Sequence, residues 1–134
     1  MRHSAALLAI LGLACDGSGP SELSLDVSAT RTFGEPLPPA FLAEAPQLTI
    51  TGTIQLDVPC YDFGGALEQS ADTLVVRLRA TRQPGTCPQE QARFNYRLLV
   101  TGLSPGVQPL RLMYDRVGPP TASQVAFEGA VEVQ

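Results

Sequence analysis

A strict alternation of apolar and polar residues between Leu48 and Val58 most limits what this chain can fold into. Every even-numbered position of this segment is apolar or glycine, and every odd-numbered position is polar. Successive side chains of a β-strand point to opposite faces, so a period of two indicates a strand with one buried face. Cys60 continues the same inward register. Such a strand needs a second layer that covers its apolar face.

Five further segments repeat the pattern. The residues expected to face inward are Leu74, Val76, Leu78 and Ala80; Ala92, Phe94, Tyr96, Leu98 and Val100; Leu110, Leu112 and Tyr114; Val125, Phe127, Gly129, Val131 and Val133; and, more weakly, Leu23, Leu25, Val27 and Ala29. A short strand around residues 66–68 would bring the number of strands to seven.

Glycine and proline account for 24 of the 134 residues and leave no convincing helical stretch. The only candidate for a helical turn is Ala40–Ala45, between two prolines, inside a predicted crossover over residues 34–46. Gly106 follows Pro105 at a place that suits a type II turn, which requires positive φ there. These features predict an all-β fold, an antiparallel immunoglobulin-like β-sandwich of about seven strands.

The segment 101–114 resembles the corner before the penultimate strands of fibronectin type III and related immunoglobulin-like domains. The residues that match are Leu103, Pro105, Gly106, Leu110 and Leu112. Pro109 stands where the corner tyrosine of that family would be, so the hydrogen bond made by that tyrosine is missing. The resemblance implies a sandwich and does not extend to the rest of the chain.

The N-terminus has the pattern of an export signal. Arg2 precedes an apolar run from Ala5 to Ala14, which is too short for the ~20 residues that a membrane-spanning helix needs. Ala14-Cys15 resembles the lipobox of bacterial lipoproteins, although Gly12 replaces the branched residue that this family prefers. The resemblance implies a signal peptide over residues 1–14 and a lipid on Cys15. The alternatives are plain secretion and a buried N-terminal helix.

These predictions divide the chain into a signal peptide, a linker and one folded domain. Residues 15–21 hold the lipidated cysteine and a Gly/Ser/Pro-rich linker, and residues 22–134 form the β-sandwich domain. We therefore expect a lipid-anchored protein of the bacterial cell envelope, or a secreted one if the lipobox is not used. Asp16 resembles the inner-membrane retention signal of enteric bacteria, but the choice between inner and outer membrane stays open.

The two remaining cysteines, Cys60 and Cys87, are expected to form a disulfide, because exported proteins fold in an oxidising compartment. Each is flanked by a proline, which favours positions at strand ends. A closed loop of about 28 residues would contribute roughly 3.5 kcal/mol in the chain-entropy model.

Residue types that most enzymes need are missing. The chain has no lysine, and its only histidine, His3, lies in the predicted signal peptide. Nucleophilic catalysis needs a base beside the nucleophile, and imidazole is the commonest ligand in zinc and copper sites. We therefore expect no enzyme activity, no cofactor and no metal site. The mature chain carries eight arginines against thirteen carboxylates, a net charge of −5, which argues against nucleic-acid binding.

Two clusters of charged residues remain as candidates. Asp57, Asp62, Glu68 and Asp72 could supply oxygen ligands for Ca²⁺, but their spacing is not that of an EF-hand, and solvated loop carboxylates are the favoured interpretation. Arg77, Arg79, Arg93, Arg97 and Arg111 all take outward positions on three consecutive strands. If these strands share a sheet, the arginines form one cationic face for an anionic envelope polymer, a lipid head group or a protein partner. The alternative is a solvated face with cross-strand ion pairs.

These inferences favour a non-catalytic binding or structural module of the cell envelope that recognises a partner through its β-sandwich surface. The alternative is a secreted or anchored protease inhibitor. Its inhibitory segment would be residues 82–88, an arginine-led, Pro/Gly-rich loop beside Cys87. A rigid loop loses little entropy on binding.

Overall fold

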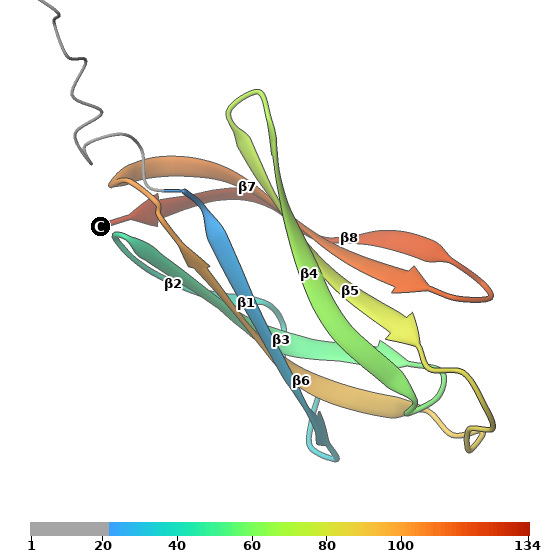
Figure 1. Ribbon diagram of the computed structural model, residues 1–134. Coiled ribbons are helices and arrows are strands. Elements are labelled where there is room, and N and C mark those ends of the chain that lie inside the picture. The colour runs from blue at the N-terminus through green and yellow to red at the C-terminus, as the bar shows by residue number, and fades with distance from the viewer. Residues whose placement is uncertain (1–21) are drawn as a thin grey trace, which may run out of the picture.

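The computed structural model describes residues 22–134, which form eight strands in two four-stranded sheets (Figure 1). The predicted signal peptide (1–14) and the whole predicted linker (15–21), with Cys15, lie outside the described residues. The strands are β1 (Ser24–Thr32), β2 (Ala40–Glu44), β3 (Gln47–Leu56), β4 (Tyr61–Ser70), β5 (Thr73–Arg82), β6 (Ala92–Thr101), β7 (Gly106–Val117) and β8 (Ala122–Val133).

The strand order is β1-β6-β3-β2 in the first sheet and β4-β5-β7-β8 in the second. The sheets lie over one another with β1 beside β4 and β2 beside β8 (Figure 1). Backbone hydrogen bonds join the second pair of edges: Ala45 N donates to Gln134 O at 2.9 Å, and Gln134 N donates to Ala43 O at 3.3 Å. Main-chain hydrogen bonds therefore connect the two sheets at one end of the sandwich.

The core consists of the inner faces of the two sheets, which are buried by the alternation seen in the sequence. The inward residues of β3, β5 and β6 are all buried, and Leu48, Ile50, Leu74 and Leu98 are fully so. Aromatic pairs bridge the sheets: Phe63 of β4 with Phe94 of β6, and Phe41 of β2 with Phe127 of β8. Their ring centroids are 4.9 and 4.5 Å apart, respectively.

The predicted all-β sandwich is confirmed, with eight strands instead of about seven. One strand pair, β5–β7, is parallel, although we expected an antiparallel fold. The chain leaves β5, crosses to the other sheet as β6 and returns as β7. Two reversals of direction make β7 run parallel to β5. The strand order also differs from that of immunoglobulin constant domains, where the third, sixth and seventh strands share a sheet.

The predicted helical turn at Ala40–Ala45 is wrong. Residues Ala40–Glu44 form strand β2, which makes a tight hairpin with β3. Phe41 points inward against Phe127, and this burial favours a strand over a turn of helix. The predicted crossover over 34–46 is consequently shorter and ends where β2 begins.

Strand β4 spans ten residues, whereas the sequence indicated only a short strand around 66–68. The pair Gly64-Gly65 conceals the alternation. The packing of β1 against β4 requires glycine at position 65, because a Cβ there would lie 2.7 Å from Leu25 Cδ2 and 2.9 Å from Val27 Cγ2. The missing side chain lets β1 approach β4.

Val125 does not face inward as expected and is 49% exposed. The pairing of β7 with β8 shifts between Leu112 and Met113, so that Phe127 pairs with Leu112 but Val125 pairs with Met113. This β-bulge inserts one extra residue and reverses the alternation of β8 on its N-terminal side.

A tyrosine pair links the middle of the two sheets. Tyr96 of β6 and Tyr114 of β7 share a hydrogen bond of 2.5 Å between their hydroxyl groups, with the rings edge to face. Gly52 of β3 leaves space for this pair, because a Cβ there would collide with the Tyr96 hydroxyl. Burial raises the pKa of both tyrosines above the usual value near 10.

These raised pKa values predict an alkaline transition. The unfolded tyrosines ionise near pH 10, while the folded ones stay protonated. The contribution of these two tyrosines to the free energy of unfolding should therefore be constant below that pH and fall as the pH rises above it. Phenolate absorbance and circular dichroism, followed together in a pH titration, should change in one transition. Full ionisation of all tyrosines near pH 10 with native circular dichroism retained would contradict this prediction.

Candidate functional site

The five arginines do not form one face, so that prediction is wrong. Arg93 and Arg97 lie on β6 in the first sheet, whereas Arg77, Arg79 and Arg111 lie on β5 and β7 in the second. All five are on outer positions, and the outer faces of the two sheets point in opposite directions. The three strands follow one another in the sequence but not in space, because the chain crosses between sheets before and after β6.

Cross-strand ion pairs occupy two arginines of the second sheet. Arg77 donates from Nε to Glu68 at 3.0 Å and from Nη1 to Asp115 at 3.1 Å. Asp115 is only 7% exposed and also accepts a hydrogen bond from the Ser123 hydroxyl. The hydrogen bonds to Glu68 and Asp115 raise the pKa of Arg77. Arg111 pairs with Glu128 at 2.7 Å. Much of the positive charge on the outer face of this sheet is therefore neutralised by carboxylates of the same face.

The outer face of the first sheet is mostly uncharged and polar. Arg97 is exposed on this face, and Arg93 donates from Nη1 to Gly34 O at 3.0 Å. The register places hydroxyl and amide side chains around the two arginines: Ser24, Ser28, Thr30, Thr32, Gln47, Thr49, Thr51, Thr53, Gln55, Asn95 and Thr101. Thr53 donates to Asn95 at 2.7 Å, so part of this surface satisfies its own hydrogen bonds.

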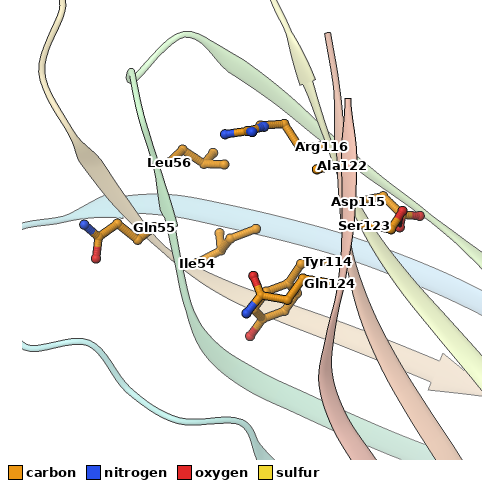
Figure 2. Close-up of a pocket in the computed structure, with 9 residues that line it drawn as sticks. All are labelled: Ile54, Gln55, Leu56, Tyr114, Asp115, Arg116, Ala122, Ser123 and Gln124. Carbon is orange, nitrogen blue, oxygen red and sulfur yellow. Dashed lines mark hydrogen bonds between the residues drawn. The ribbon is translucent and has the colours of Figure 1, made fainter. Parts of the chain in front are cut away.

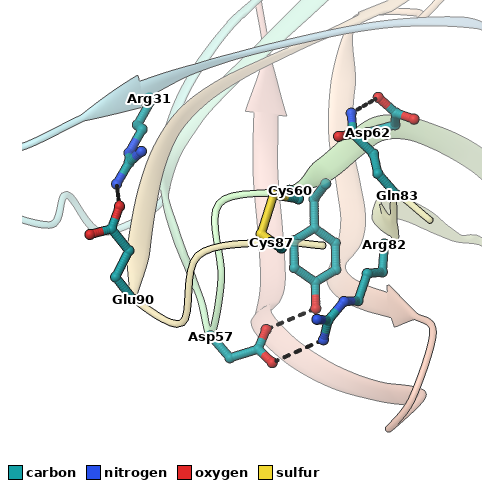
Figure 3. The surroundings of a disulfide bond; sticks show 9 residues. Arg31, Asp57, Cys60, Asp62, Arg82, Gln83, Cys87 and Glu90 are labelled. Atoms are coloured by element: carbon teal, nitrogen blue, oxygen red, sulfur yellow. Dashed lines mark hydrogen bonds and ion pairs between the residues drawn. A yellow bond between two sulfur atoms is a disulfide. The ribbon is translucent and has the colours of Figure 1, made fainter. Parts of the chain in front are cut away.

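The predicted disulfide is confirmed. Cys60 and Cys87 are bonded, with their Cα atoms 6.0 Å apart, at the end of the sandwich where β3 runs into β4 (Figure 3). The connected loop, residues 83–91, is fixed at both ends. Gln83 N donates to Cys60 O at 3.0 Å, and Glu90 pairs with Arg31 of β1 at 3.1 Å. Between these points the loop is exposed apart from Cys87.

The four carboxylates considered for Ca²⁺ are not gathered into one site. Asp57 accepts from the Tyr61 hydroxyl at 2.8 Å, Asp62 accepts from Gln83, and Glu68 pairs with Arg77. The hydrogen bond from Tyr61 lowers the pKa of Asp57. Among residues 22–134, no group of three or more His, Cys, Asp and Glu is arranged to hold a metal ion. The structure thus provides no calcium site in the described residues.

A groove that the sequence did not predict opens between β3 and the β7–β8 pair, with a volume of about 320 Å³. The side chains of Ile54 and Leu56 meet those of Tyr114, Arg116 and Gln124 there (Figure 2). Arg116 takes the inward position that follows Leu110, Leu112 and Tyr114 along β7. An arginine that continues a run of inward apolar residues is the one signal in the sequence that could have indicated this groove.

Comparison with protein-family models, curated proteins and solved structures finds no match to the chain. Within residues 22–134, no helix has the length and apolar character needed to cross a membrane.

The ion pairs of the second sheet lead to a stability prediction. Replacing Arg77 by Met should lower the free energy of unfolding by about 1–3 kcal/mol, because the buried Asp115 then loses its charged partner. Replacing the exposed Arg79 by Met is the matched control on the same strand and should change it by less than about 0.5 kcal/mol. Urea unfolding of both variants measures the difference. Equal effects of the two substitutions would refute the structural role of Arg77.

Proposed function

We propose that the protein is a non-catalytic binding module of the bacterial cell envelope, held to a membrane by a lipid on Cys15. The lipobox-like Ala14-Cys15 and the absence of lysine and of any histidine after His3 support this proposal. Its mechanism is surface recognition without turnover. A protein partner is favoured over an anionic polymer, because the single arginine face that such a polymer would need is not formed.

The short tether gives this module an orientation. Six residues separate Cys15 from Glu22, and six extended residues reach at most ~20 Å. The end of the sandwich where β1 begins, with the β2–β3 turn and the end of β8, would face the membrane (Figure 1). The opposite end carries the disulfide and the loop 83–91, roughly the length of β3, ~33 Å, further out.

The observation that carries the proposal is the construction of this distal end. A disulfide, one backbone hydrogen bond from Gln83 and the ion pair of Glu90 hold an exposed loop there. The groove with Arg116 opens beside the end of β3. Rigid exposed surface costs little entropy to bind, and loops on a rigid scaffold commonly carry function.

The lipid anchor is tested by metabolic labelling with a fatty-acid analogue in the native bacterium. The wild-type chain should carry the label and fractionate with membranes. The Cys15→Ala variant should carry no label, while its Cys60–Cys87 disulfide still forms. An unlabelled wild-type chain, or label that persists in Cys15→Ala, contradicts the proposed anchor.

One observation favours the alternative, a protease inhibitor that acts through residues 82–88. This segment is exposed around Pro84 and Gly85 and is fixed by the disulfide at Cys87. Gly85 has a φ of 106°, a conformation that other residues rarely adopt, so the loop has a defined shape. An inhibitor should block at least one enzyme of a protease panel at micromolar concentration and lose this effect in the Cys60→Ala, Cys87→Ala double variant. No inhibition across the panel removes the alternative.

A further inference from the structure

One edge of β3 is left open beside the groove. Strand β2 covers this edge only as far as Thr51, which pairs with Ala40. Past Thr51, Thr53 N donates to Leu37 O at 3.0 Å. The N–H and C=O groups of the odd-numbered residues of β3 therefore point to this side. Gln55 therefore directs its N–H and C=O to the same side, and no strand of residues 22–134 pairs with β3 there.

The guanidinium of Arg116 lies in the same groove (Figure 2). Its Nε donates to Pro120 O at 3.0 Å. Within the described chain, no carboxylate lies within 4.0 Å of Arg116, in contrast to Arg31, Arg77, Arg82 and Arg111. Asp57 is close enough for Arg116 to help lower its pKa, but its carboxylate is engaged by Tyr61 and Arg82. Arg116 thus retains the capacity to bind an anion.

The walls of the groove are apolar at the bottom and polar at the rim. Ile54 and Leu56 are each only 5% exposed and form the apolar bottom on the β3 side. Gln124 of β8 is exposed on the opposite side, and the amide of its side chain points into the groove (Figure 2). The Tyr114 hydroxyl is already bonded to Tyr96. A ligand would meet a small apolar surface, one cation and one open strand edge.

We propose that this groove binds the C-terminal end of an extended polypeptide. The terminal carboxylate pairs with Arg116, the last apolar side chain packs on Ile54 and Leu56, and a main-chain amide of the peptide pairs with Gln55. This inference rests on the proposed function as a binding module and names its partner. It does not depend on the lipid anchor.

The open edge is what favours a peptide over a small organic acid. A carboxylic acid could use Arg116 and the apolar wall but offers nothing for both the N–H and the C=O of Gln55. A peptide group supplies an acceptor and a donor in the spacing of a β-ladder, and addition of a strand to a free edge is a common mode of peptide recognition. Capture of a terminal carboxylate by a fixed cation adds a charge-assisted hydrogen bond.

The test uses the full chain, purified in detergent micelles, and pools of labelled hexapeptides that end in Val, Leu or Phe. Fluorescence polarisation compares pools with a free C-terminal carboxylate against the same pools with an amidated C-terminus. The free acids should bind, and amidation should weaken binding about tenfold or more, because the hydrogen bond to the charged group is lost. No binding of the free acids, or equal binding of both pools, overturns the proposal.

Variants separate the groove from the rest of the surface. Arg116→Gln should weaken binding about tenfold or more, and Ala122→Trp, which fills the rim but keeps the charge, should also abolish it. Arg79→Gln, on the outer face of the second sheet, is the matched control and should stay within about twofold. Circular dichroism verifies that each variant is folded. Equal binding by Arg116→Gln and the wild-type chain overturns the proposal.

A small acid serves as the second probe. 4-Methylpentanoic acid carries the carboxylate and the branched side chain without a main-chain amide, and it should compete far more weakly than the peptides. If it competes equally well, the site is for small acids and the peptide proposal is wrong. The outcome is independent of the fatty-acid labelling. If labelling fails, only the proposed lipid anchor is contradicted. If peptide binding fails, only the proposed peptide-binding groove is contradicted.

Discussion

The structure depends on the burial of two apolar sheet faces against each other. No helix covers either sheet in residues 22–134, so each four-stranded sheet is the only cover available to the other. The period of two along β3, β5 and β6 supplies the apolar faces, and the tyrosine pair at the centre adds one hydrogen bond between the layers. The hydrophobic effect that buries these faces is non-directional. The arrangement of the strands within each sheet is therefore determined by their hydrogen-bonded pairing.

The alternation along the chain predicted β3, β5, β6 and their buried faces, because it is a local property, whereas it missed β2 and most of β4. It predicted the burial of Leu74, Leu98 and their neighbours, and the prediction that Cys60 pairs with Cys87 came from the expected export of the chain and from the number of cysteines. It could not predict which strands share a sheet, since this depends on contacts distant in sequence. The alternation alone therefore predicts one face for the five arginines, although β6 lies in the other sheet. The bulge that exposes Val125 likewise arises only from the pairing of β7 with β8.

The same dependence on strand pairing hid the candidate site. The groove exists because β2 is too short to cover all of β3, and because β8 faces the uncovered part from the opposite sheet. The outward arginines that looked functional are in part structural, since Arg77 and Arg111 are held in ion pairs. Arg116, at an inward position near the end of β7, has no carboxylate within 4.0 Å among the described residues. The proposed binding site is therefore the groove beside the uncovered part of β3, where Arg116 points inward.

Native-state hydrogen exchange measured by NMR tests most directly whether this edge is open. The N–H of Ile54 points to β6 and the N–H of Thr53 donates to Leu37, so both should exchange slowly. The N–H of Gln55 should exchange quickly in the free protein, although Gln55 lies within the same strand as the other two. Protection of Gln55 equal to that of Ile54 would show that the edge is already covered, and would contradict the proposed site.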